Sequence, residues 1–131
     1  MRIERASFGR EAWPRKYFLE LYRECGGFFV VAKVAGRIAG YAVACAAKHN
    51  AEIASLAVHP DYRRLGVANA LMRHTQGELR AAGVRRVELM VRTGNTAAAQ
   101  LYRTLGFRRV RVAPGYYEDG GDGFLMARAI Q

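Results

Sequence analysis

Residues 54–72 read ASLAVHPDYRRLGVANALM, and this segment is the most informative part of the chain. Its apolar beginning is typical of a buried strand, and the run from Gly66 to about Ala82 contains no proline and predicts a helix. Between the two, Arg63 and Arg64 stand just before Gly66. A glycine there lets backbone N–H groups approach a phosphate, the positive end of the helix dipole faces it, and the arginines add charge-assisted hydrogen bonds. The stretch therefore predicts an anion-binding turn, which is neither a Walker A nor a Rossmann loop because GKS, GKT and GxGxxG are all missing.

Strand and helix patterns alternate along the rest of the chain. Runs rich in β-branched and aromatic residues predict strands at residues 28–34, 37–47, 51–58, 84–92, 107–112 and 123–130, with a short one at 2–6. Helical spacing of apolar residues predicts helices at 11–24, 66–82 and 96–105. This alternation predicts an α/β sandwich, in which helices cover both faces of a partly antiparallel sheet.

Length and composition limit the range of architectures and partners. With 131 residues, 51% of them hydrophobic, the chain is expected to form a single domain over residues 1–131 that buries roughly two thirds of its unfolded surface. The 21 basic and 11 acidic residues give a formal charge of +10, which predicts an anionic partner: a nucleic acid, a membrane or a phosphorylated small molecule. No apolar run approaches the roughly 20 residues that span a bilayer.

The N-terminal residues, the cysteines and the histidines bear on compartment and metals. MRIERASFGREAW has no apolar signal-peptide stretch, and the only cysteines are Cys25 and Cys45, so we expect a cytoplasmic protein with two buried free thiols. His49, His59 and His74 form no HxxxH pattern. No metal site is therefore expected.

A second cluster is LMVRTGNTAAAQLYRTLGF, residues 89–107, in which Asn95, Tyr102 and Gly106 follow a further predicted strand at fixed offsets in the sequence. Together with residues 54–72 it resembles the GNAT family of acetyl-CoA-dependent N-acetyltransferases, and the resemblance covers nearly the whole chain. It implies a three-layer sandwich whose mixed central sheet of about six to seven strands is flanked by about four helices. SLAVHPDYRRLGVANALM and GYYEDGGDGFLMAR are similar to the protein N-alpha-acetyltransferase branch, including archaeal enzymes and the bacterial ribosomal-protein alanine acetyltransferase.

The resemblance implies a role for each residue on the coenzyme side. Backbone groups of residues 56–58 would contact the pantetheine arm and the thioester, and residues 63–69 would wrap the pyrophosphate. Asn95 would hydrogen-bond the coenzyme, and Tyr102 would give a proton to the departing thiolate, unless it is only a helix aromatic packed on the sheet. The implied coenzyme-binding residues are Leu56, Ala57, Val58, Arg63, Arg64, Leu65, Gly66, Val67, Ala68, Asn69, Asn95 and Tyr102.

The resemblance also implies direct attack by a neutral amine on the acetyl thioester in a ternary complex. A base must first take the ammonium proton, but Met90 stands where the related enzymes have a glutamate. Three carboxylates remain as alternatives: Glu52, where histone-acetyltransferase relatives carry their glutamate, Glu88, on the same strand face as Met90, and Glu11 near the N-terminus. Each of them is equally well explained as a surface carboxylate. Because a free α-amine has a pKa of about 8 and a lysine about 10.4, a missing glutamate slightly favours an α-amine acceptor.

An aromatic and acidic loop separates the last two strands. Tyr116 and Tyr117 begin the run YYEDGGD, residues 116–122. In the branch that this chain resembles, such a loop grips the first residues of a peptide, together with residues around Trp13 and Glu11. A carboxylate beside the groove would attract the acceptor's ammonium group. An ordinary hairpin loop is the alternative.

Four functions remain open at this point. The first is acetyl-CoA-dependent acetylation of a protein N-terminal α-amine, and the second is acetylation of a small-molecule amine such as a polyamine, an aminoglycoside or an amino acid. The third is coenzyme binding without catalysis, because the base is unassigned. A nucleic-acid binder is disfavoured, since the arginines are scattered and the aromatic pair lies beside acidic residues. We expect acetyl-CoA as co-substrate, no metal, no membrane partner, and a monomer or homodimer.

Overall fold

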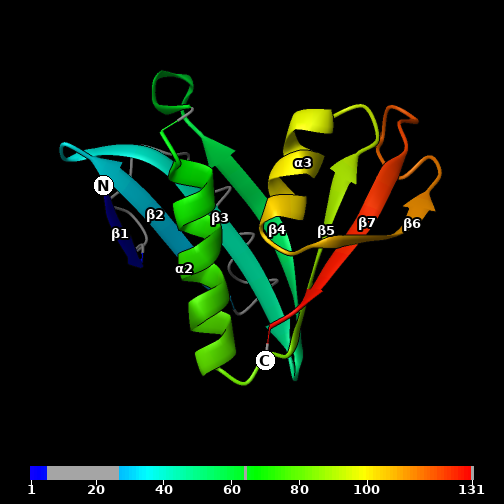
Figure 1. Ribbon diagram of the computed structural model, residues 1–131, viewed down its shortest axis with the longest axis horizontal. Helices are drawn as coiled ribbons and strands as arrows, with labels where there is room; N and C mark the ends of the chain where they lie inside the picture. The colour runs from blue at the N-terminus through cyan, green and yellow to red at the C-terminus, as the bar shows by residue number, and fades with distance from the viewer. Residues whose placement is uncertain (6–26, 64, 131) are drawn as a thin grey trace.

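The computed structural model describes residues 1–5, 27–63 and 65–130. The helix expected at 11–24 and the roles expected for Glu11, Trp13 and Arg64 lie outside the described residues. In the described parts, seven strands form one mixed sheet in the spatial order β1-β2-β3-β4-β5-β7-β6 (Figure 1). The strands are β1 (Arg2–Arg5), β2 (Phe28–Val34), β3 (Arg37–Ala47), β4 (Asn50–Val58), β5 (Arg86–Arg92), β6 (Arg108–Ala113) and β7 (Gly123–Ala129).

Two α-helices, α2 (Val67–Ala81) and α3 (Thr96–Thr104), cover one face of this sheet in the described part of the chain (Figure 1). A 3-10 helix, η1 (Pro60–Tyr62), precedes α2, and neither described α-helix is long and apolar enough to cross a membrane. The α/β fold class is confirmed. The described residues contain two of the about four expected helices, and both lie on one face, whereas the helix expected at 11–24 lies outside this part of the chain. From β2 onward the two described α-helices fill the crossovers from β4 to β5 and from β5 to β6, whereas short turns join β2 to β3 and β3 to β4.

Strands β4 and β5 pair only briefly and then separate. Their parallel register runs from Asn50 opposite Arg86 to Glu52 opposite Glu88. Directly afterwards the register between β3 and β4 skips Ala54, which marks a β-bulge. Because a bulge bends its strand, the second half of β4 stays with β3 and leaves β5, and the sheet opens into the V seen in Figure 1. On the side that faces β5, the backbone of this second half of β4 therefore does not pair with β5.

The core that holds the V together lies between the sheet and the two helices. It joins Met72 and Leu79 of α2, Val87 and Leu89 of β5, and Phe107, and each of these side chains is at most 2% exposed. Burying a side chain of this size contributes about 1.5–3 kcal/mol. This packing sets both helices with their starts at the open end of the V (Figure 1).

Cys45 in β3 is disulfide-bonded, so the expectation of free thiols is wrong. The chain's other cysteine, Cys25, lies outside the described residues. Sequence spacing carries no signal for such a bond, because its formation depends on the distance between Cβ atoms in the fold. Disulfides are uncommon in cytosolic proteins, and the cytoplasmic location stays a prediction.

Candidate active site

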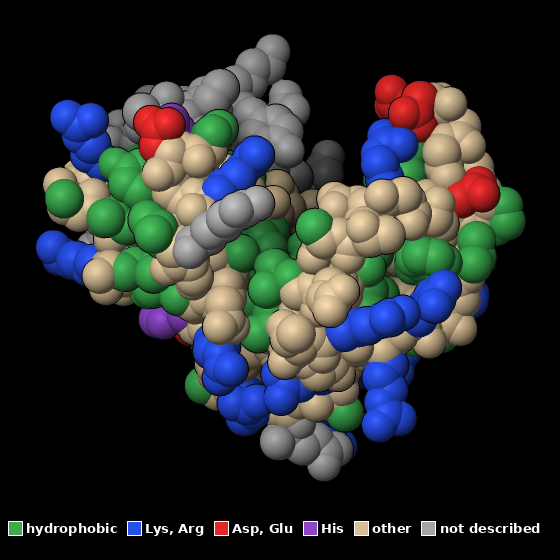
Figure 2. Space-filling view, turned by 45° about the horizontal axis from the view of Figure 1, so that its top comes forward, with side chains coloured by type: hydrophobic (Ala, Val, Ile, Leu, Met, Phe, Trp, Pro, Cys, Tyr) green, Lys and Arg blue, Asp and Glu red, His purple; other side chains and the backbone are tan. Residues whose placement is uncertain are grey.

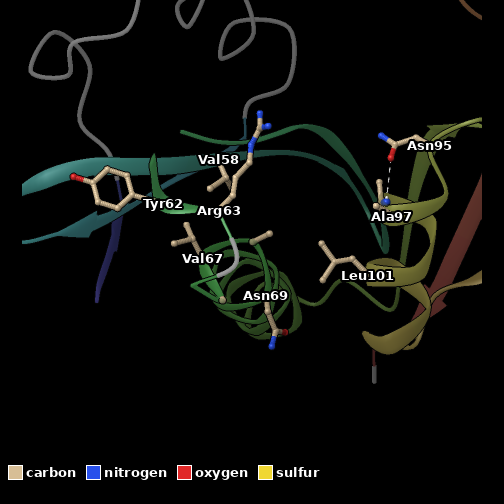
Figure 3. A pocket seen from close by; sticks show the side chains of 11 residues that line it. Val58, Tyr62, Arg63, Val67, Asn69, Asn95, Ala97 and Leu101 are labelled. Carbon is tan, nitrogen blue, oxygen red and sulfur yellow. Dashed lines mark hydrogen bonds between the residues drawn. The ribbon is translucent and has the colours of Figure 1, made fainter. Parts of the chain in front are cut away.

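A cleft of about 660 Å³ opens where the starts of α2 and α3 face each other beyond the end of β4 (Figure 3). The space-filling view shows a hollow between the two halves of the molecule, with hydrophobic side chains on its floor (Figure 2). The residues from the predicted coenzyme side that line the cleft are Val58, Arg63, Gly66, Val67, Ala68, Asn69 and Asn95. The fold thus brings together two sequence clusters, one before α2 and one before α3.

The start of α2 forms one wall of the cleft and is uncapped. Gly66 has a left-handed backbone with a φ of 76°, no side chain caps the helix, and its first turn contains no acidic residue. The first N–H groups of a helix have no carbonyl partner within it, and the helix dipole makes this end positive. Arg63 is exposed and lines the cleft beside it (Figure 3). The arrangement suits a phosphate group.

The start of α3, across the cleft, is capped by its own residue. Oδ1 of Asn95 accepts a hydrogen bond from the N–H of Ala98 at 3.1 Å (Figure 3). The amide nitrogen of Asn95 is the group that remains to donate to a ligand in the cleft. Any contact of Asn95 with a coenzyme is therefore expected to be a donated hydrogen bond.

Four residues of the predicted coenzyme side do not line the cleft. The side chains of Leu56 and Ala57 pack into the core on opposite faces of β4, and Leu65 is 57% exposed. Tyr102 is half-buried in α3, and its ring lies edge-on to Phe107 with 6.1 Å between the centroids. The backbone of Leu56 and Ala57, on the side that β5 has left, is therefore where we expect them to meet a ligand.

The environment of Tyr102 keeps its hydroxyl protonated. Burial raises the pKa of Tyr102 above its ordinary value of 10.0, and the neighbouring Tyr117 raises it further. Proton transfer from a phenol at about 10 to a thiolate at about 8.5 already costs about 2 kcal/mol, and this site does not lower the phenol's pKa to reduce that cost. At neutral pH Tyr102 is a hydrogen-bond donor.

We expect a late-ionising phenol in an alkaline titration followed by ultraviolet absorbance, and its loss in Tyr102→Phe. Because the folded pKa is raised, the contribution of this group to stability is present below pH 10.0 and is lost as the pH rises through the folded value. The free energy of unfolding of the wild type should accordingly fall more steeply above that pH than that of the variant. If the phenol missing from the variant ionises at the ordinary tyrosine pKa, the burial of this hydroxyl is contradicted.

The two candidate bases on the strands lie side by side. Glu52 and Glu88 are opposite each other in the last pair of the β4–β5 ladder. Their neighbours in sequence, Ile53 and Leu89, point into the helix-side core, so the carboxylates point to the other face. Glu52 is exposed, whereas Glu88 forms an ion pair of 3.1 Å with Arg86. Among the described residues, no three potential metal ligands cluster here or elsewhere.

The loop between β6 and β7, residues 114–122, is closed by its own hydrogen bonds. Asp122 accepts from the N–H of Gly115 at 2.8 Å, and Asp119 accepts from the N–H of Gly121 at 2.9 Å. The rings of Tyr116 and Tyr117 pack edge-to-face at 4.9 Å. Two of the loop's carboxylates thus accept hydrogen bonds from the loop's own backbone. The sequence had suggested that a carboxylate of this loop attracts the acceptor's ammonium group.

Arg92, at the end of β5, is the residue that sequence reasoning missed. Its guanidinium lies over the ring of Tyr117, 4.1 Å from the centroid, and forms an ion pair of 3.0 Å with Asp119. In Figure 2 acidic side chains gather on the rim of the hollow next to a basic one. Nothing in the local sequence indicates this contact, because Arg92 and Asp119 are 27 residues apart.

Comparison with known proteins identifies the family. Residues 1–107 match the model of the acetyltransferase (GNAT) family. The chain belongs to the GNAT acetyltransferase family. It is 33% identical to an N-alpha-acetyltransferase of Sulfurisphaera tokodaii, covering 92% of this chain and 80% of the relative. It is 38% identical over 98 residues to the ribosomal protein bS18-alanine N-acetyltransferase of Escherichia coli, which covers 72% of this chain and 66% of that enzyme.

The structure of Ard1 from Thermoplasma volcanium is similar to this GNAT acetyltransferase with a TM-score of 0.88 and 29% identity, covering 99% of this chain and 97% of the other. The resemblance found in the sequence is confirmed, as is the assignment as an acetyltransferase enzyme. The family match ends at residue 107, before the β6–β7 loop. The cleft residues therefore lie within the matched part of this GNAT chain, and the loop that holds Tyr117 lies beyond it.

Proposed function

We propose that this GNAT acetyltransferase uses acetyl-CoA to acetylate the α-amine of a protein N-terminus, in a ternary complex. The observation that carries the proposal is the cleft at the opening of the V, where the uncapped start of α2 meets Arg63. The acceptor class is supported by the similarity to enzymes named N-alpha-acetyltransferase and ribosomal protein bS18-alanine N-acetyltransferase.

The coenzyme fits the chemistry of the residues in the cleft. Its pyrophosphate would lie on the N–H groups of the first turn of α2, beside Arg63, because both are donors with positive charge or dipole. Arg64, outside the described residues, is proposed to act with them. The apolar lining from Val58 and Leu101 suits the uncharged pantetheine arm. Asn95 would donate its amide N–H to the arm from the opposite wall.

Acetyl-CoA supplies an activated acetyl thioester when bound. The backbone of residues 56–58 would orient the thioester carbonyl, since this edge of β4 lies outside the ladder with β5. Tyr102 would donate a hydrogen bond to the sulfur and, once the amine nitrogen has bonded to the carbonyl carbon, transfer its proton as the carbon–sulfur bond breaks. The proton that the nitrogen then loses would return Tyr102 to its neutral form. Tyr116 and Tyr117 are proposed to bind the acceptor peptide by its backbone.

The acceptor must lose one ammonium proton before it attacks. Glu52 is the first candidate for the base, because it is exposed at the point where β4 and β5 separate, whereas Glu88 beside it is paired with Arg86. An α-amine has a pKa of about 8, so roughly a tenth of it is neutral at pH 7 and a weak base or a water chain suffices. A lysine side chain would demand a stronger base.

A mass-spectrometric assay tests the acceptor class. The protein is incubated with isotope-labelled acetyl-CoA, a peptide library with free N-termini, the same library with blocked N-termini, and a panel of small amines. We expect label on the free α-amines and none on the blocked peptides. Label on small amines alone would overturn the acceptor, and no label anywhere would overturn the proposed reaction.

The phosphate contact gives a separate prediction. Arg63→Ala is expected to weaken acetyl-CoA binding about tenfold, because it removes a charge-assisted hydrogen bond from an exposed site. Isothermal titration calorimetry measures the effect. Arg111→Ala is the control, since Arg111 is an exposed residue of β6 outside the cleft. Equal affinity of Arg63→Ala and the wild type would remove this arginine from the proposed coenzyme site.

A further inference from the structure

The β6–β7 loop is fastened to the end of β5 by Arg92, which contacts three different parts of it. The guanidinium covers the ring of Tyr117 and pairs with the carboxylate of Asp119. It also lies against the backbone at Gly121, where an added Cβ would come within 2.6 Å of the Arg92 nitrogen. One side chain thus holds an aromatic, a charged and a backbone group of the same loop.

Residues of β5 and β7 also pack against the part of the loop that holds Tyr117. An added Cβ on Gly123 would lie 2.7 Å from Cε of Met90 and 3.4 Å from Cε2 of Tyr117, so Met90 and the Tyr117 ring converge on this glycine. The N–H of Thr93 donates to the carbonyl of Asp122 at 3.1 Å. The Tyr117 ring therefore lies against Met90 and Gly123, and the Arg92 guanidinium lies over its face.

Tyr117 also bears on Tyr102, because it adds to the effect of burial in raising the pKa of the Tyr102 phenol. Tyr102 belongs to α3, and Tyr117 belongs to the loop beyond β6. The position of the loop therefore decides how close the second phenol stands to the first. A loop that moved away from Arg92 would carry Tyr117 with it.

We propose that Arg92 is a positioning residue that fixes Tyr117 and so builds the wall of the acceptor site. This inference rests on the proposed function, because it assigns the wall to binding of the acceptor peptide. Asp119 acts on Arg92 and on the turn at Gly121, so its carboxylate serves to hold the loop and does not bind the acceptor's ammonium group. Arg92 touches neither the coenzyme nor the acceptor in this role.

The test compares Arg92→Ala with Arg109→Ala. Arg109 makes the same kind of contact elsewhere, over the ring of Phe124 at 4.3 Å, and is the matched control. We expect Arg92→Ala to raise the KM for a peptide acceptor about tenfold, since small misplacements at a reacting site have large effects on rate and binding. The KM for acetyl-CoA should stay within about twofold, because the loop lies away from the start of α2. Arg109→Ala should change neither constant.

Two further variants separate positioning from charge. Arg92→Lys keeps the charge but loses the planar group that stacks on Tyr117 while it reaches Asp119, so it should not restore the peptide KM. Asp119→Asn combined with Arg92→Ala should add little to the single variant, because both belong to one contact. Full rescue by lysine, or additive losses in the double variant, would overturn the positioning role.

Hydrogen–deuterium exchange gives a readout that does not depend on acetylation. Arg92→Ala should speed amide exchange in residues 114–122 at least about fivefold and leave α2 unchanged. If the wild type acetylates nothing, the proposed function fails, whereas unchanged exchange in this variant overturns the inference on its own. Faster exchange with an unchanged peptide KM in an active enzyme would also overturn it, because the loop would then be ordered by Arg92 without serving the acceptor.

Discussion

Tyr102→Phe is expected to lower the turnover number of acetyl transfer about a hundredfold, with acetyl-CoA affinity changed less than about twofold. The hydroxyl would assist the departing sulfur, and phenylalanine retains the ring that packs on Phe107. Because burial and Tyr117 raise the pKa of Tyr102, the hydroxyl stays protonated throughout the neutral range. The loss should therefore be the same from pH 6 to pH 9, where neither protein changes the charge of this residue.

Steady-state kinetics at several pH values measure this effect, and calorimetry measures the coenzyme affinity. Tyr41→Phe is the control, since it removes the hydroxyl of a buried tyrosine that packs in a separate cluster of β2 and β3. Turnover of Tyr41→Phe should be close to that of the wild type. If Tyr102→Phe also keeps wild-type turnover, Tyr102 is only a helix aromatic packed on the sheet.

Gly40→Ala is expected to destabilise the fold by about 1–3 kcal/mol, because the added methyl group has no space. An ideal Cβ at Gly40 would lie 2.6 Å from the backbone oxygen of Ala57 and 3.2 Å from side-chain carbons of Val67 and Leu71. The oxygen belongs to the half of β4 that has left β5, and Val67 begins α2. The substitution should therefore push apart the elements that line the cleft and weaken acetyl-CoA binding as well.

Urea unfolding compares this variant with Gly77→Ala, the same substitution in a different environment. Gly77 lies inside α2, and an added Cβ there meets nothing within 4 Å. Alanine in a helix interior is favoured over glycine by about 1 kcal/mol, so Gly77→Ala should be more stable than the wild type. A Gly40→Ala protein as stable as the wild type would contradict the close approach of β3 and β4 at this point.

More of the candidate coenzyme side than of the candidate acceptor side could be predicted from the sequence. Residues 54–72 and 95–102 are contiguous segments, and a strand, a glycine and a helix start can be recognised from neighbours in sequence. The structure places Val58, Gly66 and Asn95 along one cleft. What local pattern could not supply is which backbone and side-chain groups remain for a ligand, because Asn95 caps α3 with its oxygen and no side chain caps α2.

The candidate acceptor side was less predictable, because its contacts are long-range. The acidic loop indicated an attraction for an ammonium group, but Asp119 is paired with Arg92 from another strand. Cys45 is disulfide-bonded although the sequence predicted a free thiol. Glu52 and Glu88 were separate candidates in sequence and are opposite residues in the β4–β5 register. The pairing of Asp119 with Arg92 and of Glu52 with Glu88 joins residues that are far apart in the sequence.

Local sequence was enough to predict the order of strands and helices in the described part of the chain, the glycine and helix start before α2, and the family, because these depend on local periodicity, on glycine placement and on contiguous motifs. The bulge at Ala54 that parts β4 from β5, the shared face of α2 and α3, and the contact of Arg92 with Tyr117 became visible in the folded chain alone. The physical reason is that register and packing join residues far apart in the chain, where local propensity carries no information about the partner.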